Sequence, residues 1–282
     1  MLWILGVIAI IILIIIIWFK LSYSPTKREF EKLIRQQIAK TQFQNDHFSA
    51  KDLSKLPSPV QRYFHYCGFI DTPKMTNMRI DFNNVDFVLS PDKPMQKIKY
   101  TQYNFVEKPT RFAYIGTSLF GIPFEGIDSY QNGTGSMKGV IAKAFTLFNQ
   151  KGEAMDKACL VTCLSESLMI PLFALQDFIT WEELDESHAK ATISYYGLTA
   201  SGIFTFDTDG AMTAFTTEDR AFSDGKGEMK KVKWTAFCSD YKEVNGIKYP
   251  NNLKAVWHFE TGDLLYFHGR DINIEYNVFY KS

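Results

Sequence analysis

An unbroken apolar run, residues 2–19, precedes every other pattern in the chain and carries no charged side chain. As a helix rising 1.5 Å per residue, this segment would be about 27 Å long, close to the roughly 30 Å hydrocarbon core of a bilayer. Trp3 and Trp18 stand near its two ends, where indole rings favour the headgroup region. The pattern predicts a transmembrane anchor over residues 1–20.

A cleaved signal peptide is the alternative interpretation of this run. It requires basic residues ahead of a shorter apolar core of about 7–15 residues, followed by small residues at a cleavage site. No basic side chain precedes the run, and residues 21–24 form a poor cleavage context. We therefore expect a retained, single-pass helix in the cell membrane. The positive-inside rule places the rest of the chain in the cytoplasm, because basic residues follow the run closely: Lys20, Lys27, Arg28, Lys32 and Arg35.

Residues 21–45 carry the pattern of an amphipathic helix next to the membrane. Phe30, Leu33, Ile34 and Ile38 recur at the spacing of one helical face. The basic side chains on the other faces suit anionic headgroups. Packing of the apolar stripe against the following domain is the alternative role of this helix.

From Asn77 onward the period changes to two, as is typical of half-buried strands. Turn pairs such as Asn245-Gly246 separate the segments, and such short links favour antiparallel pairing of consecutive strands. Residues 160–178 interrupt the pattern with an apolar stretch broken by Pro171, which predicts short helices covering one face of the sheet. The alternating segments are residues 78–82, 85–89, 98–105, 111–115, 189–195, 203–206, 212–215, 232–237, 253–259 and 272–276.

Aromatic residues make up 15% of the chain, and in the predicted strands they alternate with polar residues. An apolar sheet face must be covered by another sheet, a helix or a ligand, and residues 160–178 are short for so many strands. We therefore predict a mainly β, α+β fold. A transmembrane helix is followed by one domain over residues 46–282, a strongly curved, half-barrel-like antiparallel sheet with a few covering helices. Its hollow is either a ligand cavity or a core filled by side chains.

Composition excludes several classes of protein. The 31 basic and 31 acidic residues cancel, which argues against a nucleic-acid partner. The chain contains no zinc-protease motif, P-loop, nucleophile elbow or calcium-binding loop, and its five histidines are scattered. We predict no metal site, no cofactor and no catalytic residue. The four cysteines show no disulfide plan.

Four polar or aromatic residues are the candidate ligand-binding set. Glu166 lies inside the apolar stretch, where a carboxylate is either paired or has a raised pKa. We predict that Glu166 and Arg220 form a polar spot at the mouth of the cavity, with Trp181 beside it and Arg62 on the short helix that begins near Ser58. A structural ion pair or a solvent-facing glutamate is the alternative for Glu166.

One set of residues is spread over most of residues 50–280: Leu56 to Tyr63, Gly68, Gly133 to Gly139, Leu164 to Pro171, Trp181, Arg220, Gly246 to Pro250, Trp257, Gly262, Tyr266 and Gly269. In these residues the sequence resembles a bacterial family of conserved, often membrane-associated proteins that is known only as a domain of unknown function. This resemblance implies no catalytic role. More weakly, the layout is similar to the lipoprotein-carrier and lipid-binding half-barrels of bacterial envelopes, which implies a lipid ligand and a location outside the cytoplasm.

Three functions remain open at this point. The first is a membrane-anchored, non-enzymatic domain that binds an apolar ligand, such as a lipid or a lipid-modified molecule, in the concavity of the sheet. The second is a hydrolase-type enzyme that uses Glu166 with Arg220. The third is a structural module that binds an unknown protein partner in a membrane complex.

Overall fold

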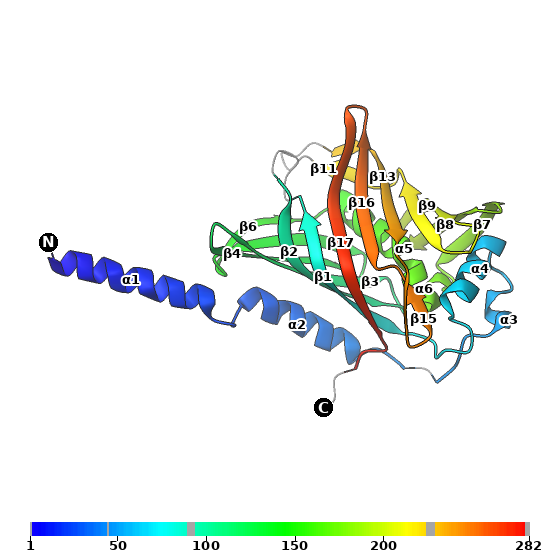
Figure 1. Ribbon diagram of the computed structural model, residues 1–282, viewed down its shortest axis with the longest axis horizontal. Coiled ribbons are helices and arrows are strands. Elements are labelled where there is room, and N and C mark those ends of the chain that lie inside the picture. Colours follow the sequence, from blue (N-terminus) through cyan, green and yellow to red (C-terminus); the bar gives the residue numbers. More distant parts are fainter. Residues whose placement is uncertain (1, 44, 89–93, 224–228, 280–282) are drawn as a thin grey trace.

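The computed structural model in Figure 1 describes residues 2–43, 45–88, 94–223 and 229–279. Some residues of the predicted elements lie outside this part of the chain. They are residue 44 of the predicted amphipathic segment, Leu89 of one predicted strand, and residues 280–282 of the predicted domain. In the sequence, the helices either precede the first strand or lie between β6 and β7. They are α1 (Leu2–Lys20), α2 (Pro25–Ile38), α3 (Ala50–Leu53), α4 (Ser58–Cys67), α5 (Glu153–Ser165), the 3₁₀ turn η1 (Ser167–Met169) and α6 (Pro171–Ala174).

The strands within the described residues form one thirteen-stranded sheet and two short ribbons. The sheet runs in the order β6-β5-β4-β3-β2-β1-β17-β16-β13-β10-β9-β8-β7, and the ribbons are β11-β12 and β14-β15. The strands are β1 (Asn77–Phe87), β2 (Gln96–Phe105), β3 (Thr110–Leu119), β4 (Ile122–Gln131), β5 (Thr134–Ile141), β6 (Phe145–Gln150), β7 (Ile179–Asp185), β8 (His188–Tyr195), β9 (Leu198–Phe206), β10 (Met212–Thr217), β11 (Ala221–Ser223), β12 (Met229–Lys231), β13 (Lys233–Ser239), β14 (Lys242–Val244), β15 (Ile247–Tyr249), β16 (Asn252–Phe259) and β17 (Gly262–Tyr276).

The sheet consists of two antiparallel meanders joined in the middle. Strands β1 to β6 form one meander, and the other runs from β7 to β17. The two meet where β1 pairs with β17, with Met78 opposite Tyr276. Antiparallel pairing of consecutive strands, predicted from the short turns, is confirmed within each meander.

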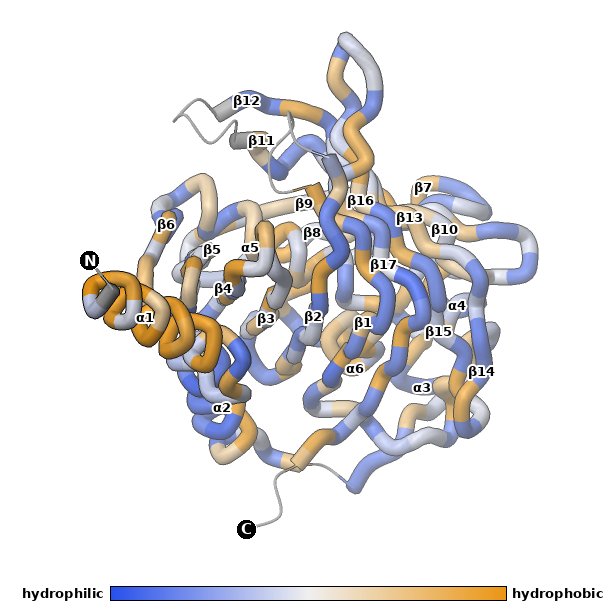
Figure 2. Tube along the Cα trace, turned by 60° about the vertical axis from the view of Figure 1, so that its left-hand side comes forward, coloured by the Kyte–Doolittle hydropathy of each residue, from blue (hydrophilic) through white to orange (hydrophobic). Residues whose placement is uncertain are grey.

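The sheet is strongly curved and remains open at β6 and β7 (Figures 1 and 2). Helix α5 lies in the hollow and contacts β4 and β5 from one meander and β8 and β9 from the other. A flat sheet would keep these strands far apart, because seven other strands separate them in the sheet order. The predicted half-barrel with a few covering helices is confirmed.

Helix α2 packs on the outer, convex face of β3 and β4. Its buried residues Phe30, Ile34 and Ile38 form a second core with rings and aliphatic side chains of the sheet, including Phe112 and Ile127. Neighbours in sequence such as Ala113 belong to the main core inside the hollow, because successive strand side chains point to opposite faces. Both faces of β2, β3 and β4 are therefore covered.

Helix α1 extends away from the sheet (Figure 1). By length and composition it can cross a membrane, and its side chains from Trp3 to Ile17 are exposed. The short α4 ends at Gly68, which adopts a left-handed conformation with φ of 75°. A Cβ on Gly68 would lie 2.5 Å from the carbonyl oxygen of Gly246, so a side chain there would displace the β14–β15 turn.

Candidate functional site

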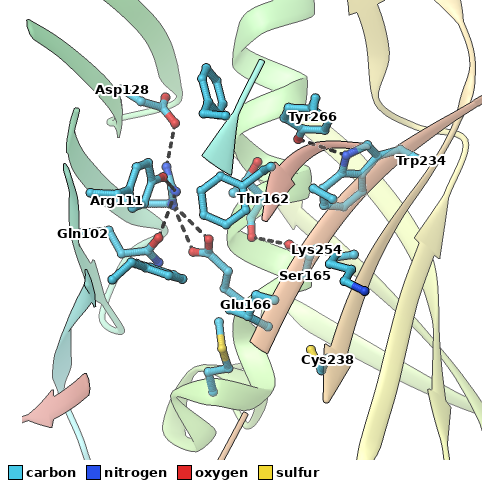
Figure 3. Close-up of a pocket in the computed structure, with 18 of the residues that line it drawn as sticks. Gln102, Arg111, Asp128, Thr162, Ser165, Glu166, Trp234, Cys238, Lys254 and Tyr266 are labelled. Carbon is cyan, nitrogen blue, oxygen red and sulfur yellow. Dashed lines mark hydrogen bonds and ion pairs between the residues drawn. The ribbon is translucent and has the colours of Figure 1, made fainter. Parts of the chain in front are cut away.

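A cavity of about 180 Å³ lies between α5, η1 and the concave face of the sheet (Figure 3). We call it the sheet cavity. Its wall comes from both meanders and is mostly aromatic and aliphatic. The rings that line it are Phe82, Phe87, Tyr100, Trp234, Tyr266 and Phe267. The hollow is therefore only partly filled by side chains of the protein.

One wall of the sheet cavity is polar and centred on Arg111 of β3 (Figure 3). The Arg111 Nε donates to Glu166 Oε2 at 3.0 Å, and Nη1 donates to Asp128 Oδ2 at 2.7 Å. Its Nη2 donates to the Tyr100 hydroxyl at 2.6 Å and to Gln102 Oε1 at 3.2 Å. These five residues form the Arg111 cluster, in which each guanidinium nitrogen has a partner.

Strand register brings the cluster together. Arg111 is opposite Asn104 on β2, and Ala113, two residues further on β3, is opposite both Gln102 and Asp128. Because residues two apart share a face, these side chains all point into the hollow. Glu166 comes from the opposite side of the hollow, at the residue that ends α5.

Charge balance explains why the buried arginine is tolerated. Arg111 is 4% exposed. Burial by itself lowers the pKa of a guanidinium, but Glu166, Tyr100 and Asp128 outweigh it and hold the pKa of Arg111 above its ordinary value. Glu166 Oε2 also accepts a hydrogen bond of 2.6 Å from Asn104 Nδ2. Both Glu166 oxygens are thus occupied by donors, which is the arrangement of a structural carboxylate.

Arg220 lies on another part of the cavity wall. Its guanidinium carbon is 5.0 Å from the centre of the Trp234 ring, within cation–π range. Its Nη1 donates to the Ala158 carbonyl at 3.0 Å and to the Thr162 hydroxyl, both on α5. Arg220 therefore ties the covering helix to the second meander while its side chain borders the cavity.

The structure separates the four residues predicted to bind a ligand. Glu166 and Arg220 both line the sheet cavity, but Glu166 takes Arg111 rather than Arg220 as its ion-pair partner. Trp181 on β7 donates its Nε1 to the Ala174 carbonyl and packs against Phe204 in the core. Arg62 on α4 donates to the Glu186 carbonyl. Neither Trp181 nor Arg62 lines the cavity.

Arg111 and Asp128 were absent from the predicted set for a physical reason. In residues 111–115 the aromatic Phe112 and Tyr114 indicate the buried face, which leaves Arg111 on the apparent solvent side. The aromatic pair instead packs against α2 on the convex face, and Arg111 points into the hollow. The small and apolar Ala113 and Ile115, on the same face as Arg111, are the signal that a second buried face exists.

No group of three or more histidine, cysteine or acidic side chains is placed to hold a metal ion among the described residues. All four cysteines are buried free thiols. The chemistry offered by the sheet cavity is therefore an apolar surface with a fixed ionic wall, suited to holding an apolar or amphipathic molecule.

Comparison with known proteins places this chain in a family without an assigned activity. Residues 46–269 match the family described as "Family of unknown function (DUF6544)", and the chain belongs to it. The match includes the residues of the Arg111 cluster. The comparison with curated proteins gives no match.

Among solved structures, the chain is similar to a LolA superfamily protein from Nitrosomonas europaea. The two are 8% identical in sequence, with a TM-score of 0.39. The similarity covers 78% of this chain and 94% of the other.

Proposed function

We propose that the protein is a membrane-tethered domain that binds an apolar or amphipathic molecule in the sheet cavity. Residues 1–20 would be the anchor in the cell membrane, residues 21–45 the adjoining segment, and residues 46–282 the binding domain. The observation that carries this proposal is the cavity of about 180 Å³ between α5 and the curved sheet, with a wall that is mostly aromatic and aliphatic.

The size of the cavity indicates how much of a ligand it takes. A cavity of roughly 150 Å³ lined by apolar side chains holds a benzene molecule. Sites for whole drug-sized ligands are larger, about 300–1,000 Å³. The sheet cavity therefore suits a small apolar molecule or a segment of a lipid acyl chain, for which each buried CH₂ contributes about 0.8 kcal/mol.

The charged side chains of the wall suit a ligand with an anionic end. Arg111 has carboxylate partners on both sides, whereas Arg220 makes its described contacts to a ring, a carbonyl and a hydroxyl. A fatty acid or another lipid with an acidic group has both the apolar body and the charge that this wall matches.

The contacts of Glu166 favour binding over hydrolysis. A general acid must hold a proton and release it to the substrate. Glu166 instead accepts hydrogen bonds from Arg111 and Asn104, so both of its oxygens are already engaged within the protein. We expect a Glu166→Gln variant to retain ligand binding, whereas abolished turnover of a substrate in this variant would support the hydrolase.

The proposal is tested by identifying the bound molecule. Native mass spectrometry and lipid extraction of the detergent-purified full chain are expected to show a co-purifying apolar molecule. Ala236, on β13, lines the sheet cavity, and an Ala236→Phe variant is expected to lose the molecule because the ring fills the space. Ala214→Phe is the matched control, since Ala214 is opposite Phe237 on the outer face.

Two results would refute the proposal. One is a protein that carries no molecule and does not bind an added fluorescent fatty acid. The other is equal ligand retention by the Ala236→Phe and Ala214→Phe variants, because the occupied site would then lie outside the sheet cavity.

A further inference from the structure

Two neighbouring hairpins at one end of the sheet expose large apolar side chains. Phe120, at the tip of the β3–β4 hairpin, is 105% exposed, and Ile122 follows it at 37%. On edge strand β6, Phe145 is 68% exposed and Leu147 is 56% exposed. We call these four residues the hairpin patch. Phe145 and Leu147 are two residues apart and therefore point to the same side of the strand.

The end of α1 is attached to the second of these hairpins, β5–β6, by hydrogen bonds. Trp18 Nε1 donates to the Ala142 carbonyl at 3.0 Å in the β5–β6 turn. The neighbouring Lys143 is buried, and its Nζ donates to the carbonyls of Trp18, Leu21 and Tyr23 at 3.3, 2.6 and 3.2 Å. Lysine at the C-terminal end of a helix satisfies carbonyls that have no partner within the helix. The direction of α1 relative to the sheet is therefore fixed by specific contacts.

The β3–β4 tip lies beside the last turn of α1. Ile16, Phe19 and Lys20 of the helix line a common groove with Gly121 and with other residues of the hairpin tip. Figure 1 shows this end of the sheet, near the label β4, next to the end of α1. Ile16 and Lys20 are four residues apart, which corresponds to about 6 Å along the helix axis. The tip thus reaches about one helical turn back along the apolar segment.

The turn that carries Phe120 adds a second observation. Phe120 and Gly121 have φ of 52° and 82°, the left-handed conformation of a two-residue hairpin turn. The first position of such turns favours asparagine, which stands at Asn132 and Asn245 in two other turns of this chain. A bulky side chain with positive φ is strained. Phe120 keeps an unfavourable backbone conformation while its ring is wholly exposed, so neither turn geometry nor packing within the protein explains the residue.

We propose that the hairpin patch inserts into the surface of the same bilayer that α1 crosses. This inference rests on the anchoring part of the proposed function and goes beyond it, because it fixes which side of the domain faces the membrane. Apolar faces of peripheral segments enter the headgroup and acyl boundary by about 5–10 Å, and the position of the tip beside Ile16 agrees with that depth. Lys20, Lys27 and Arg28 lie near the level of the headgroups.

A lipid surface fits the patch better than a protein partner because the patch continues onto α1. The side chains of α1 are exposed from Trp3 to Ile17, so a bilayer that covers them also reaches the hairpin tip beside Ile16. Trp18 and Tyr23, whose ring centres are 6.2 Å apart, are the amphipathic rings that favour this boundary.

The test measures lipid contact at single positions of the full chain. Phe120→Cys and Phe145→Cys variants are labelled with a bimane fluorophore and reconstituted into phosphatidylcholine–phosphatidylglycerol vesicles. These vesicles contain a phosphatidylcholine with a nitroxide near the top of its acyl chains. The native thiols are buried, so the unsubstituted protein is the labelling control. Leu184→Cys, on the opposite edge strand β7 and 43% exposed, is the matched soluble position, and Ile12→Cys reports the anchor itself.

We expect labels at 120 and 145 to lose most of their fluorescence to the nitroxide lipid and to be shielded from aqueous iodide, with the reverse at 184. If 120 and 145 behave like 184 while 12 is quenched by lipid, the hairpin insertion is wrong and the anchor stands. If the label at position 12 is not quenched by the nitroxide lipid, both the hairpin insertion and the membrane anchor are wrong. Shielding from iodide at 120 without quenching by lipid would show that protein covers the patch, which also overturns the inference.

Discussion

Arg111 and Glu166 form an ion pair of 3.0 Å between β3 and the end of α5, across the hollow of the sheet. The arginine side chain is 5% exposed and the glutamate side chain 14% exposed. The pair therefore joins the covering helix to the first meander, as Arg220 joins the same helix to the second. The position of α5, and with it the shape of the sheet cavity, depends on these two arginines.

Arg111→Met is expected to lower the free energy of unfolding by about 3–5 kcal/mol, because it leaves Asp128 and Glu166 in the hollow without their cation. Denaturant unfolding of the full chain in detergent, followed by tryptophan fluorescence, measures this loss. Glu166→Gln is the comparison: Arg111 keeps Asp128, so we expect a smaller loss of about 1.5–3 kcal/mol. Equal and small losses for both variants would show that the ion pair does not hold α5.

Arg220→Met is expected to weaken binding of a fatty acid more than binding of a neutral apolar probe, because it removes a charge that only the fatty acid meets, besides the contacts to α5. Loss of one hydrogen bond to a charged group costs about 1.5–3 kcal/mol, which corresponds to at least roughly tenfold in affinity. Titration with fluorescent ligands of both kinds measures the difference. Arg62→Met is the control, since Arg62 lies outside the cavity wall. Equal weakening of both ligands would argue against a charge contact with Arg220.

Lys143→Met is expected to loosen the junction between α1 and the sheet, because it removes the donor to three carbonyls. Amide hydrogen exchange at Leu21, whose N–H donates to the Ile17 carbonyl, should become faster. Lys138→Met is the matched control: Lys138 pairs with Glu29 in an exposed ion pair, worth about 0–1 kcal/mol. Unchanged exchange at Leu21 would contradict the role of Lys143.

The buried thiols are expected to resist labelling until the protein unfolds. Burial raises the pKa of Cys67 and that of Cys238 from about 9 to about 12, so the reactive thiolate is scarce at neutral pH. Reaction with a maleimide should therefore be slow in the native protein and fast in denaturant. Rapid labelling of the native protein would contradict the packing around these residues. Membrane topology consequently requires an engineered surface thiol, since Cys238 is inaccessible.

The same thiols predict that the free energy of unfolding falls at high pH. Their pKa is raised in the folded state, so the unfolded chain releases these protons first as the pH rises. Their contribution to stability is complete below pH 9 and is lost between about pH 9 and pH 12. Cys67→Ala should reduce the steepness of this loss in unfolding experiments from pH 8 to pH 11; an unchanged slope would show that Cys67 does not contribute.

Much of the fold was predictable because its determinants are local. The apolar run of α1, the stripe Phe30, Ile34 and Ile38 on α2, and the alternation from Asn77 onward each depend on neighbours in sequence. The curvature of the sheet was predictable from the excess of rings over covering helices. Strands β4, β5, β6 and β7 of the sheet were not among the predicted segments because they lack a clear alternation; β7, for example, exposes Glu182 and Glu183 on consecutive positions.

The partners in the site were not predictable because they depend on distant pairings. Glu166 was selected for its apolar neighbours in sequence, but Arg111 is 55 residues away and reaches it only through the curl of the sheet. Trp181 and Arg62 were selected on local grounds, and in the fold neither lines the cavity. Helix α2 covers the outer face of β3, so the aromatic residues of this strand do not mark the inner face. For this reason the pattern did not show that Arg111 points inward.

The seam between β1 and β17 sets the order in which the protein can mature. Strand β17 follows every other strand of the sheet in the sequence, yet it pairs with β1 at the centre of the sheet. During synthesis the half-formed meander β1 to β6 has an open edge at β1, and the hollow does not yet have its second wall. The sheet cavity therefore obtains its second wall only once β17 has been synthesised and can pair with β1.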